Sequence, residues 1–212
     1  MGVAVPRGYG FDKASLAASN FLPVDRMILG FFRRAESRKR LIDGLQARID
    51  QAARVPGLYR RLQVPDTVEG RFEAVCLHVH LAMRRLKQLP PPAEDVAQDL
   101  INAVFAQFDA SLRELGVGDV GVPKRMKKLA QAFYGRAGGY DVALDAGDRT
   151  ALALALGRNV LGDADGERAG PLADYVIAAD ATLAGASLDD LLGDGPRFPR
   201  PDDVGTALGA ET

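Results

Sequence analysis

The sequence predicts an all-α fold, with a single compact multi-helix domain between a disordered N-terminal extension and a C-terminal tail. Apolar residues recur at spacings of three and four along most of the chain, which is the period of one face of a helix. The alternating patterns typical of strands are nearly absent. Short stretches rich in proline and glycine separate the periodic segments, as is usual for loops between helices.

The composition restricts the class of protein. Of the 212 residues, 47% are hydrophobic and 26% are charged, so the chain can bury a substantial core. No stretch approaches the roughly 18–20 uninterrupted apolar residues of a transmembrane helix. The single cysteine excludes an internal disulfide framework and fits a reducing compartment. A net charge of −1 argues against a dedicated nucleic-acid binder, which usually has a basic domain.

The N-terminal part of the chain divides into two segments. Residues 1–26 show no helical or strand period and lack the marks of a signal peptide, so we interpret them as a disordered extension or as sequence upstream of a start at Met27. Residues 27–34 combine apolar and basic side chains and could form a peripheral anchor on a membrane surface. Its members are Ile28, Leu29, Phe31, Phe32, Arg33 and Arg34. The alternative is a flexible start whose apolar residues pack on the domain.

The helical domain is expected over residues 35–198. Its first helix should end before Pro56, because a residue preceding proline avoids the α conformation. Asp66 and Thr67 should cap the second helix, since short polar side chains accept hydrogen bonds from free backbone N–H groups. That helix is apolar on nearly all sides, which predicts that it is the most buried one. Its apolar residues are Val68, Phe72, Val75, Cys76, Leu77, Val79, Leu81, Met83 and Leu86.

A third helix is predicted to follow the QLPPPAED break and to run to Leu115. We expect its inward side to carry Leu100, Val104, Phe105, Phe108, Leu112 and Leu115. Gly116 should stop it in a Schellman motif, with Val117 folding back on Leu112. Further helices are expected over 122–136 and 171–183, and a last short one in SLDDLLGDG. Residues 140–144 and 150–161 are expected to form one broken helix or two short ones. Residues 199–212 are interpreted as a flexible tail.

The helix over 122–136 has two distinct sides. Val122, Met126, Leu129, Ala130 and Phe133 share one side, whereas Lys124, Lys127, Lys128 and Gln131 share the other. Arg125 and Arg136 lie at one border, and Tyr134 lies near the opposite one. The basic side is either a solvated surface or a docking face for an anionic or membrane-proximal partner. In the second case, Phe133 or Tyr134 would be an aromatic anchor.

The sequence gives little support for catalysis or metal binding. The nucleophile-elbow, Walker and HExxH motifs are all absent. Cys76 and His80 share a helix face, but two ligands alone make a poor metal site, so core packing is the favoured interpretation. The glycine-rich GRAGGY follows a helix and not a strand, which disfavours a dinucleotide site. We therefore expect no enzyme activity, no cofactor, no metal and no small-molecule substrate.

A longer set of motifs resembles the ubiquinol–cytochrome c chaperone family. The resemblance runs from MILGFFRR at Met27 to Phe198 and is strongest in FAQFDASLRELGVGDVGVPKRMKKLAQAFYGR, residues 105–136. It also includes LHVHLAMRRL and Tyr140, whereas the 26 leading residues carry none of the family's features. The resemblance implies an all-helical, non-catalytic assembly factor that binds the cytochrome b subunit of ubiquinol–cytochrome c reductase. The compact chain and the lack of a transit-peptide-like, arginine- and serine-rich N-terminus favour a bacterial protein, which we expect in the cytoplasm, peripheral to the inner membrane.

The residues and the resemblance together predict one contact surface. Its members are Lys124, Arg125, Lys127, Lys128, Phe133, Tyr134 and Arg136. The client would be cytochrome b, with a small helper protein, the ribosome or the membrane as further contacts. The rival interpretation is a helical RNA- or ribosome-binding module that uses the same basic face.

Overall fold

The computed structural model describes residues 24–204, with side chains described from Glu36 onward, and this part of the chain is helical without strands. Residues 1–38 and 39–212 form two units. The α-helices are α1 (Val24–Ala52), α2 (Pro56–Arg60), α3 (Val68–Gln88), α4 (Ala93–Glu114), α5 (Gly121–Asp145), α6 (Arg149–Leu156), α7 (Gly170–Ala184) and α8 (Leu188–Leu192). A π-helical turn, η1 (Gly157–Leu161), and a 3-10 turn, η2 (Glu167–Ala169), join α6 to α7. The all-α prediction is confirmed.

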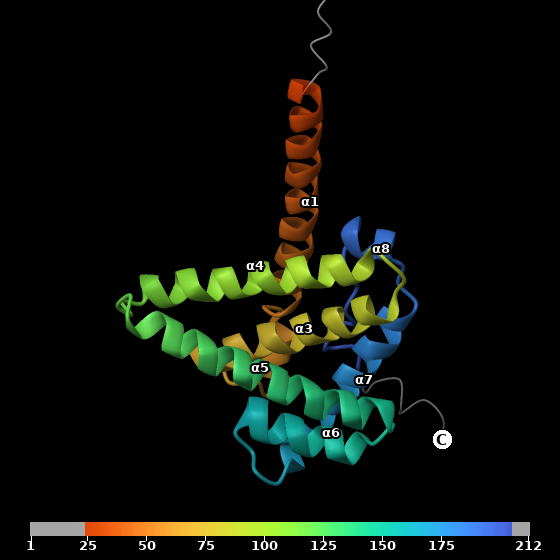
Figure 1. The fold of residues 1–212 in the computed structure, drawn as a ribbon. Coiled ribbons are helices and arrows are strands. Elements are labelled where there is room, and N and C mark those ends of the chain that lie inside the picture. The colour runs from red at the N-terminus through yellow and green to blue at the C-terminus, as the bar shows by residue number, and fades with distance from the viewer. Residues whose placement is uncertain (1–23, 205–212) are drawn as a thin grey trace, which may run out of the picture. The chain divides into compact units, whose positions relative to one another are not determined.

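Helix α3 is the centre of the domain. It packs against α4, α5 and α7, and it contributes more buried residues than any other helix in the described part of the chain (Figure 1). Thr67 caps its first turn by accepting a hydrogen bond from the Gly70 amide at 3.1 Å, which confirms the predicted start. Because the side chains of α3 are enclosed on several sides, this one helix positions α4 and α5 as well as α7.

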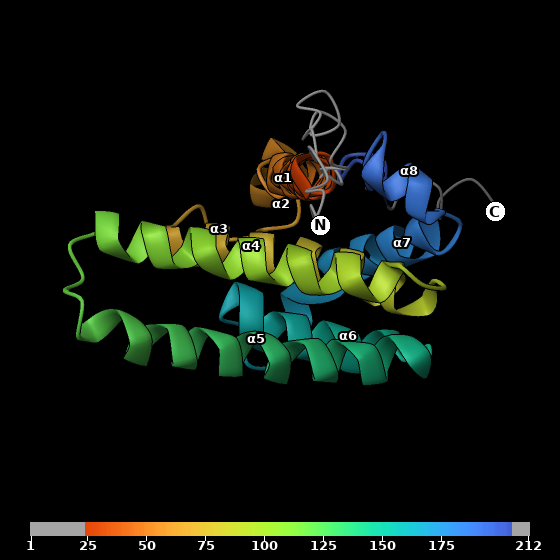
Figure 2. The ribbon, with the colours of Figure 1, turned by 45° about the horizontal axis from the view of Figure 1, so that its top comes forward.

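Helices α4 and α5 form an antiparallel hairpin that lies along α3 (Figure 2). Gly116 adopts a left-handed conformation with φ of 80°, and its amide donates to the Arg113 carbonyl at 2.9 Å. The Val117 amide donates to the Leu112 carbonyl at 3.0 Å. These two bonds are those of a Schellman motif, so the predicted end of α4 is confirmed. Leu115, however, is 69% exposed and does not face the core as expected, because α4 ends before it.

A chain of aromatic contacts fastens the hairpin to α3. Phe72 of α3 lies 4.8 Å from Phe108 of α4, measured between ring centroids. Phe108 is followed by Phe105 at 6.0 Å, and Phe105 meets Phe133 of α5 edge-to-face at 6.1 Å. Such tilted pairs each contribute about 0.5–1.5 kcal/mol beyond the area that they bury. The three helices therefore share one continuous apolar seam.

Helix α5 is longer than the sequence predicts. It runs without interruption from Gly121 to Asp145, whereas a break after Arg136 and a separate helix over 140–144 were expected. Gly135, Gly138 and Gly139 thus lie inside a helix, although glycine is about 1 kcal/mol less favourable there than alanine. The reason is tertiary, because the residues beyond the glycines are anchored to other helices.

Arg84 supplies that anchor. Its guanidinium donates to Asp141 and Asp145 of α5 at 3.0 and 2.6 Å, and to Asp180 of α7 at 3.0 Å. The Arg84 side chain is only 12% exposed. Burial alone would lower the pKa of Arg84, but its hydrogen bonds to Asp145 and Asp141 and the charge of Asp180 raise this pKa above its usual value. One side chain of α3 thus holds two neighbouring helices.

The C-terminal segment packs on the domain as far as the structure describes it. Arg61 donates to the backbone carbonyls of Asp202 and Val204, the latter at 2.8 Å, and Pro201 is buried. The flexible tail expected over residues 199–212 stays a prediction; as far as the structure describes this segment, the carbonyls of Asp202 and Val204 attach it to Arg61. Residues 205–212 lie outside the described part of the chain.

The N-terminal part of the described chain is helix α1. Helix α1 begins at Val24, so the helical period starts earlier than the expected residue 35. Residues 1–23 lie outside the described part of the chain, as do the side chains of Ile28, Leu29, Phe31, Phe32, Arg33 and Arg34. Within residues 24–204, the helices are too short or too polar for any of them to cross a bilayer.

We predict that Arg84→Met destabilises the domain by about 3 kcal/mol, the lower end of the range for breaking a buried ion pair, because the three carboxylates are partly exposed. Urea denaturation followed by circular dichroism would measure the loss. Arg113→Met is the matched control, since Arg113 pairs with Asp109 and Asp119 on the surface and should change stability far less. Equal effects of the two substitutions would show that the Arg84 junction does not hold the helices.

A candidate partner-binding surface

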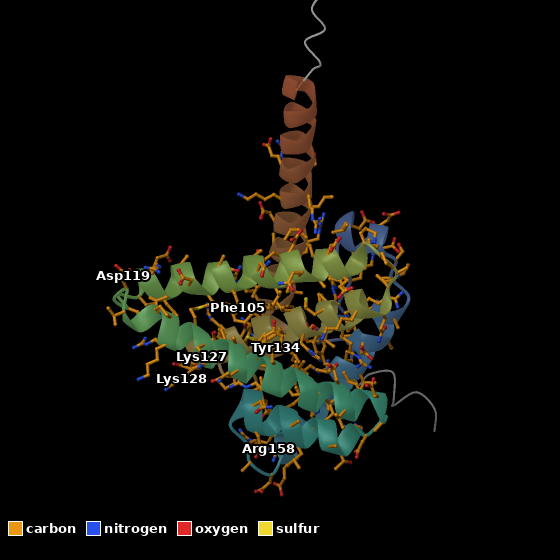
Figure 3. All side chains as sticks on the ribbon, in the orientation of Figure 1. Phe105, Asp119, Lys127, Lys128, Tyr134 and Arg158 are labelled. Carbon is orange, nitrogen blue, oxygen red and sulfur yellow. The ribbon has the colours of Figure 1, made fainter. Side chains whose placement is uncertain are left out.

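The outer side of α5 carries a group of exposed cations that we call the basic face, made of Lys124, Arg125, Lys127 and Lys128. Figure 3 shows Lys127 and Lys128 directed away from the other helices. None of the four forms an ion pair with any residue in the described part of the chain. Their charges are therefore left for solvent or for a partner.

The inner side of α5 explains why the basic face is held outward. Val122 and Phe133 are buried, and Met126, Leu129 and Ala130 are partly buried. This division confirms the predicted two-sided pattern of residues 122–136. Because the apolar side is enclosed against α4 and α3, the helix cannot rotate to bury its lysines.

The turn between α4 and α5 is held by a surface ion-pair cluster. Arg113 donates to Asp109 at 2.7 Å and also to Asp119, whose side chain is 90% exposed. Asp119 lies at the tip of the hairpin, beside the start of α5 (Figure 3). Leu115 and Val120 flank the same turn and are 69% and 94% exposed. The tip thus presents apolar side chains next to the basic face.

The structure separates the two aromatic residues that the sequence offered as anchors. Phe133 is only 6% exposed and packs on Phe105, so it belongs to the core and not to the accessible surface. Tyr134 is 54% exposed, and its ring meets that of Phe133 edge-to-face at 5.3 Å. Of these two residues, only Tyr134 is exposed enough to contact a partner. Its ring packs against the buried ring of Phe133.

Arg136 also has a role inside the protein. Its guanidinium pairs with Glu73 of α3, whose side chain is 12% exposed. Burial raises the pKa of the Glu73 carboxyl, although the charge of Arg136 opposes this. Arg136 itself remains 28% exposed. The pair connects α5 to α3, which makes Arg136 a positioning residue at the edge of the surface.

Cys76 and His80 are enclosed between α3 and α5. Burial raises the pKa of the Cys76 thiol, which keeps it protonated and unreactive. Burial also lowers the pKa of His80 to about 4, against the opposing charge of Asp141. The His80 Nε2 atom lies 3.5 Å from Asp141 Oδ1 without forming a hydrogen bond. Across residues 24–204, no three side chains of ligand type gather as a metal site would require.

The basic face continues into a stretch of glycines that sequence reasoning did not assign to the surface. Gly135, Gly138 and Gly139 are exposed, and a Cβ atom added at any of them would meet no neighbour within 4 Å. Val142, one turn further, is 71% exposed. The sequence does contain an indication of this exposure. The glycines continue the spacing of three and four residues that places Lys124, Lys128 and Gln131 on one side of the helix.

The family model for the ubiquinol–cytochrome C chaperone matches residues 60–198. The chain belongs to this family. The match includes all of the α4–α5 hairpin and the basic face.

Two relatives illustrate the family. A solved structure of the Cbp3 homolog from Brucella abortus is 42% identical, with a TM-score of 0.74, over 84% of this chain and 99% of that one. The ubiquinol–cytochrome-c reductase complex assembly factor 1 of Xenopus laevis is 26% identical over 103 residues, which is 49% of this chain and 51% of the relative. The chain thus spans about half the length of that curated relative.

We predict that the same substitution has opposite effects at two glycines of the hairpin. Gly116→Ala should destabilise the domain by about 1–2 kcal/mol, because a left-handed conformation is costly for a residue with a Cβ atom. Gly138→Ala should stabilise it by about 1 kcal/mol, because its helical position has open space. Urea denaturation of the two variants in parallel would measure both, and a loss of stability in Gly138→Ala would contradict the open environment of that position.

Proposed function

We propose that this chain is a non-catalytic assembly chaperone that binds the cytochrome b subunit during biogenesis of ubiquinol–cytochrome c reductase. The contact surface is the basic face together with Tyr134, and Arg136 lies at its edge. The observation that carries the proposal is a set of exposed cations that form no ion pair within the described part of the chain, on a helix whose opposite side is fixed in the core. Membership of the family, and the similarity to the reductase assembly factor of Xenopus laevis, support the assignment to this complex.

The arrangement of the charges supports a binding role. Lys124 and Lys128 are four residues apart on α5, and such like-charge pairs destabilise a helix by roughly 0.2–0.5 kcal/mol. A partner with acidic side chains, or one that lies beside anionic lipid, would relieve this repulsion on binding. The exposed Leu115 and Val120 would add apolar contact, in the manner of an interface with a mixed apolar and charged composition.

We predict that Lys124→Glu/Lys128→Glu lowers recovery of cytochrome b from native membranes by about tenfold or more, because repulsion replaces attraction at two positions. The measurement is a pull-down with the tagged full chain, after circular dichroism has shown that the variant is folded. Lys87→Glu/Arg158→Glu is the matched control, since it makes the same change in net charge at exposed residues of α3 and η1.

Each outcome of that pull-down discriminates. Equal recovery by wild type and by the α5 variant would refute the proposed surface. Recovery that also fails in the Lys87/Arg158 control would show that net charge, and not the position on α5, governs the interaction. If the wild type recovers RNA in place of cytochrome b, and loses it between low and moderate salt, the nucleic-acid alternative is correct.

We propose further that residues 27–34 contact the membrane surface as a peripheral anchor. Support comes from the sequence, where apolar side chains precede Arg33 and Arg34, and from the helical backbone of this segment in α1. Each basic residue near an anionic surface contributes about 1 kcal/mol.

We predict that the wild-type chain sediments with vesicles that contain phosphatidylglycerol and is released by salt, whereas deletion of residues 27–40 abolishes sedimentation. The deletion leaves the basic face intact, so the shortened chain should still recover cytochrome b that has been solubilised in detergent. This recovery is the control that the shortened chain is folded and binds its client. Sedimentation that persists after the deletion would show that another surface carries the membrane contact.

A further inference from the structure

A second surface feature lies far along the chain from the basic face. A groove of about 650 Å³ is bounded by the end of α1 on one side and by the segment 194–201 on the other, with Tyr175 of α7 also lining it. This volume lies within the range of about 300–1,000 Å³ that is common for binding clefts. Apolar parts of the wall come from Ala52, Val55, Pro196, Phe198 and Pro199. The groove therefore exists only because the segment after α8 packs on the domain.

The charges of the groove are predominantly positive. Arg48, Arg197 and Arg200 line it, with Asp194 as its single acidic residue. Asp194 pairs with Arg197 at 3.2 Å, but both side chains are about four-fifths exposed, so the pair is weak. Neither Arg48 nor Arg200 forms an ion pair with the described part of the chain. Two guanidinium groups thus remain available to a carboxylate.

Arg48 is held in place by the backbone of the opposite wall. Its side chain crosses Gly195, where a Cβ atom would lie 1.9 Å from Arg48 Cδ. Gly195 is buried and has a φ of 88°, a conformation that other residues rarely adopt. Because the aliphatic part of Arg48 rests on this glycine, its guanidinium is positioned before any ligand arrives, which lowers the entropy lost on binding.

The base of the groove is equally fixed. The Tyr175 hydroxyl donates to Nε2 of His78 at 2.7 Å, while Nδ1 of His78 donates to the Ala74 carbonyl at 2.7 Å. The Phe198 ring meets the His78 imidazole edge-to-face, with centroids 4.8 Å apart. His78 is fully buried and has both ring nitrogens satisfied, so this cluster ties the groove wall to α3.

We propose that this groove is a docking site for an extended segment of a partner protein in which acidic side chains alternate with apolar ones. The carboxylates pair with Arg48 and Arg200, and the apolar side chains lie against the proline and phenylalanine wall. Charge complementarity selects such a segment, because the free cations outnumber the acidic lining and arginine binds carboxylate groups through two parallel hydrogen bonds. The site is separate from the proposed function, since it shares no residue with the basic face.

A peptide fits these features better than a nucleic acid does. Binding of single-stranded nucleic acid relies on aromatic rings that are free to stack on bases. Here the Phe198 ring is already engaged with His78, and the Tyr175 side chain is almost wholly buried. The prolines offer apolar surface without backbone donors, which suits the side chains of an extended peptide.

The test uses the full chain and a fluorescein-labelled peptide of sequence Gly-Glu-Leu-Asp-Phe-Glu-Gly, with fluorescence anisotropy as the measurement. We expect saturable binding that weakens with salt, and at least tenfold weaker binding of the neutral peptide Gly-Gln-Leu-Asn-Phe-Gln-Gly. Arg48→Gln/Arg200→Gln should weaken binding of the acidic peptide by tenfold or more. Lys124→Gln/Lys128→Gln makes the same charge change on α5 and should leave it unchanged.

This comparison separates the groove from the chaperone surface. The Arg48/Arg200 variant should still recover cytochrome b, whereas the α5 charge-reversal variant should still bind the acidic peptide. Absence of peptide binding, equal binding of the neutral peptide, or an unchanged affinity of the Arg48/Arg200 variant would each overturn the proposal. So would binding of oligouridylate that requires Arg48 and Arg200 and displaces the peptide, since the groove would then be a nucleic-acid site.

Discussion

The contact between Arg84 and three aspartates is the constraint on which the arrangement of this domain depends. Arg84 stands on the most enclosed helix, and its carboxylate partners come from α5 and α7. A guanidinium has several donors in a fixed plane, so one side chain can bind carboxylates from more than one helix. Leaving that charge with fewer partners at 12% exposure would be costly, which couples the positions of the three helices.

The contacts of Arg84 explain why α5 is a long helix although its glycines have a low helix propensity. Three glycines lie near its centre, where local preference favours a break. The N-terminal half is fixed by the aromatic contact between Phe133 and Phe105, and the C-terminal half by Asp141 and Asp145. Because both halves are attached to neighbouring helices, the first to α4 and the second to α3, the glycines between them remain helical. The outer side of α5 is then a continuous exposed strip, on which cations are followed by glycines.

The two proposed binding surfaces illustrate different ways of presenting charge. On α5, lysines project into solvent from a rigid helix, and their flexible side chains suit a partner approached over a broad area. In the groove, Arg48 is placed by Gly195 of the opposing wall. The first arrangement favours long-range attraction, and the second favours defined pairing with a carboxylate.

Local sequence determined much of this protein. The helical period, the Thr67 cap, the Schellman motif after α4 and the two sides of residues 122–136 are all short-range features, since each depends on residues within one or two turns. Only the tertiary structure decided that Phe133 is buried while Tyr134 is exposed, that α5 continues through its glycines, and that residues 199–204 pack against Arg61. Those outcomes depend on partners about 30 to 140 residues away, and no spacing within a single helix contains that information.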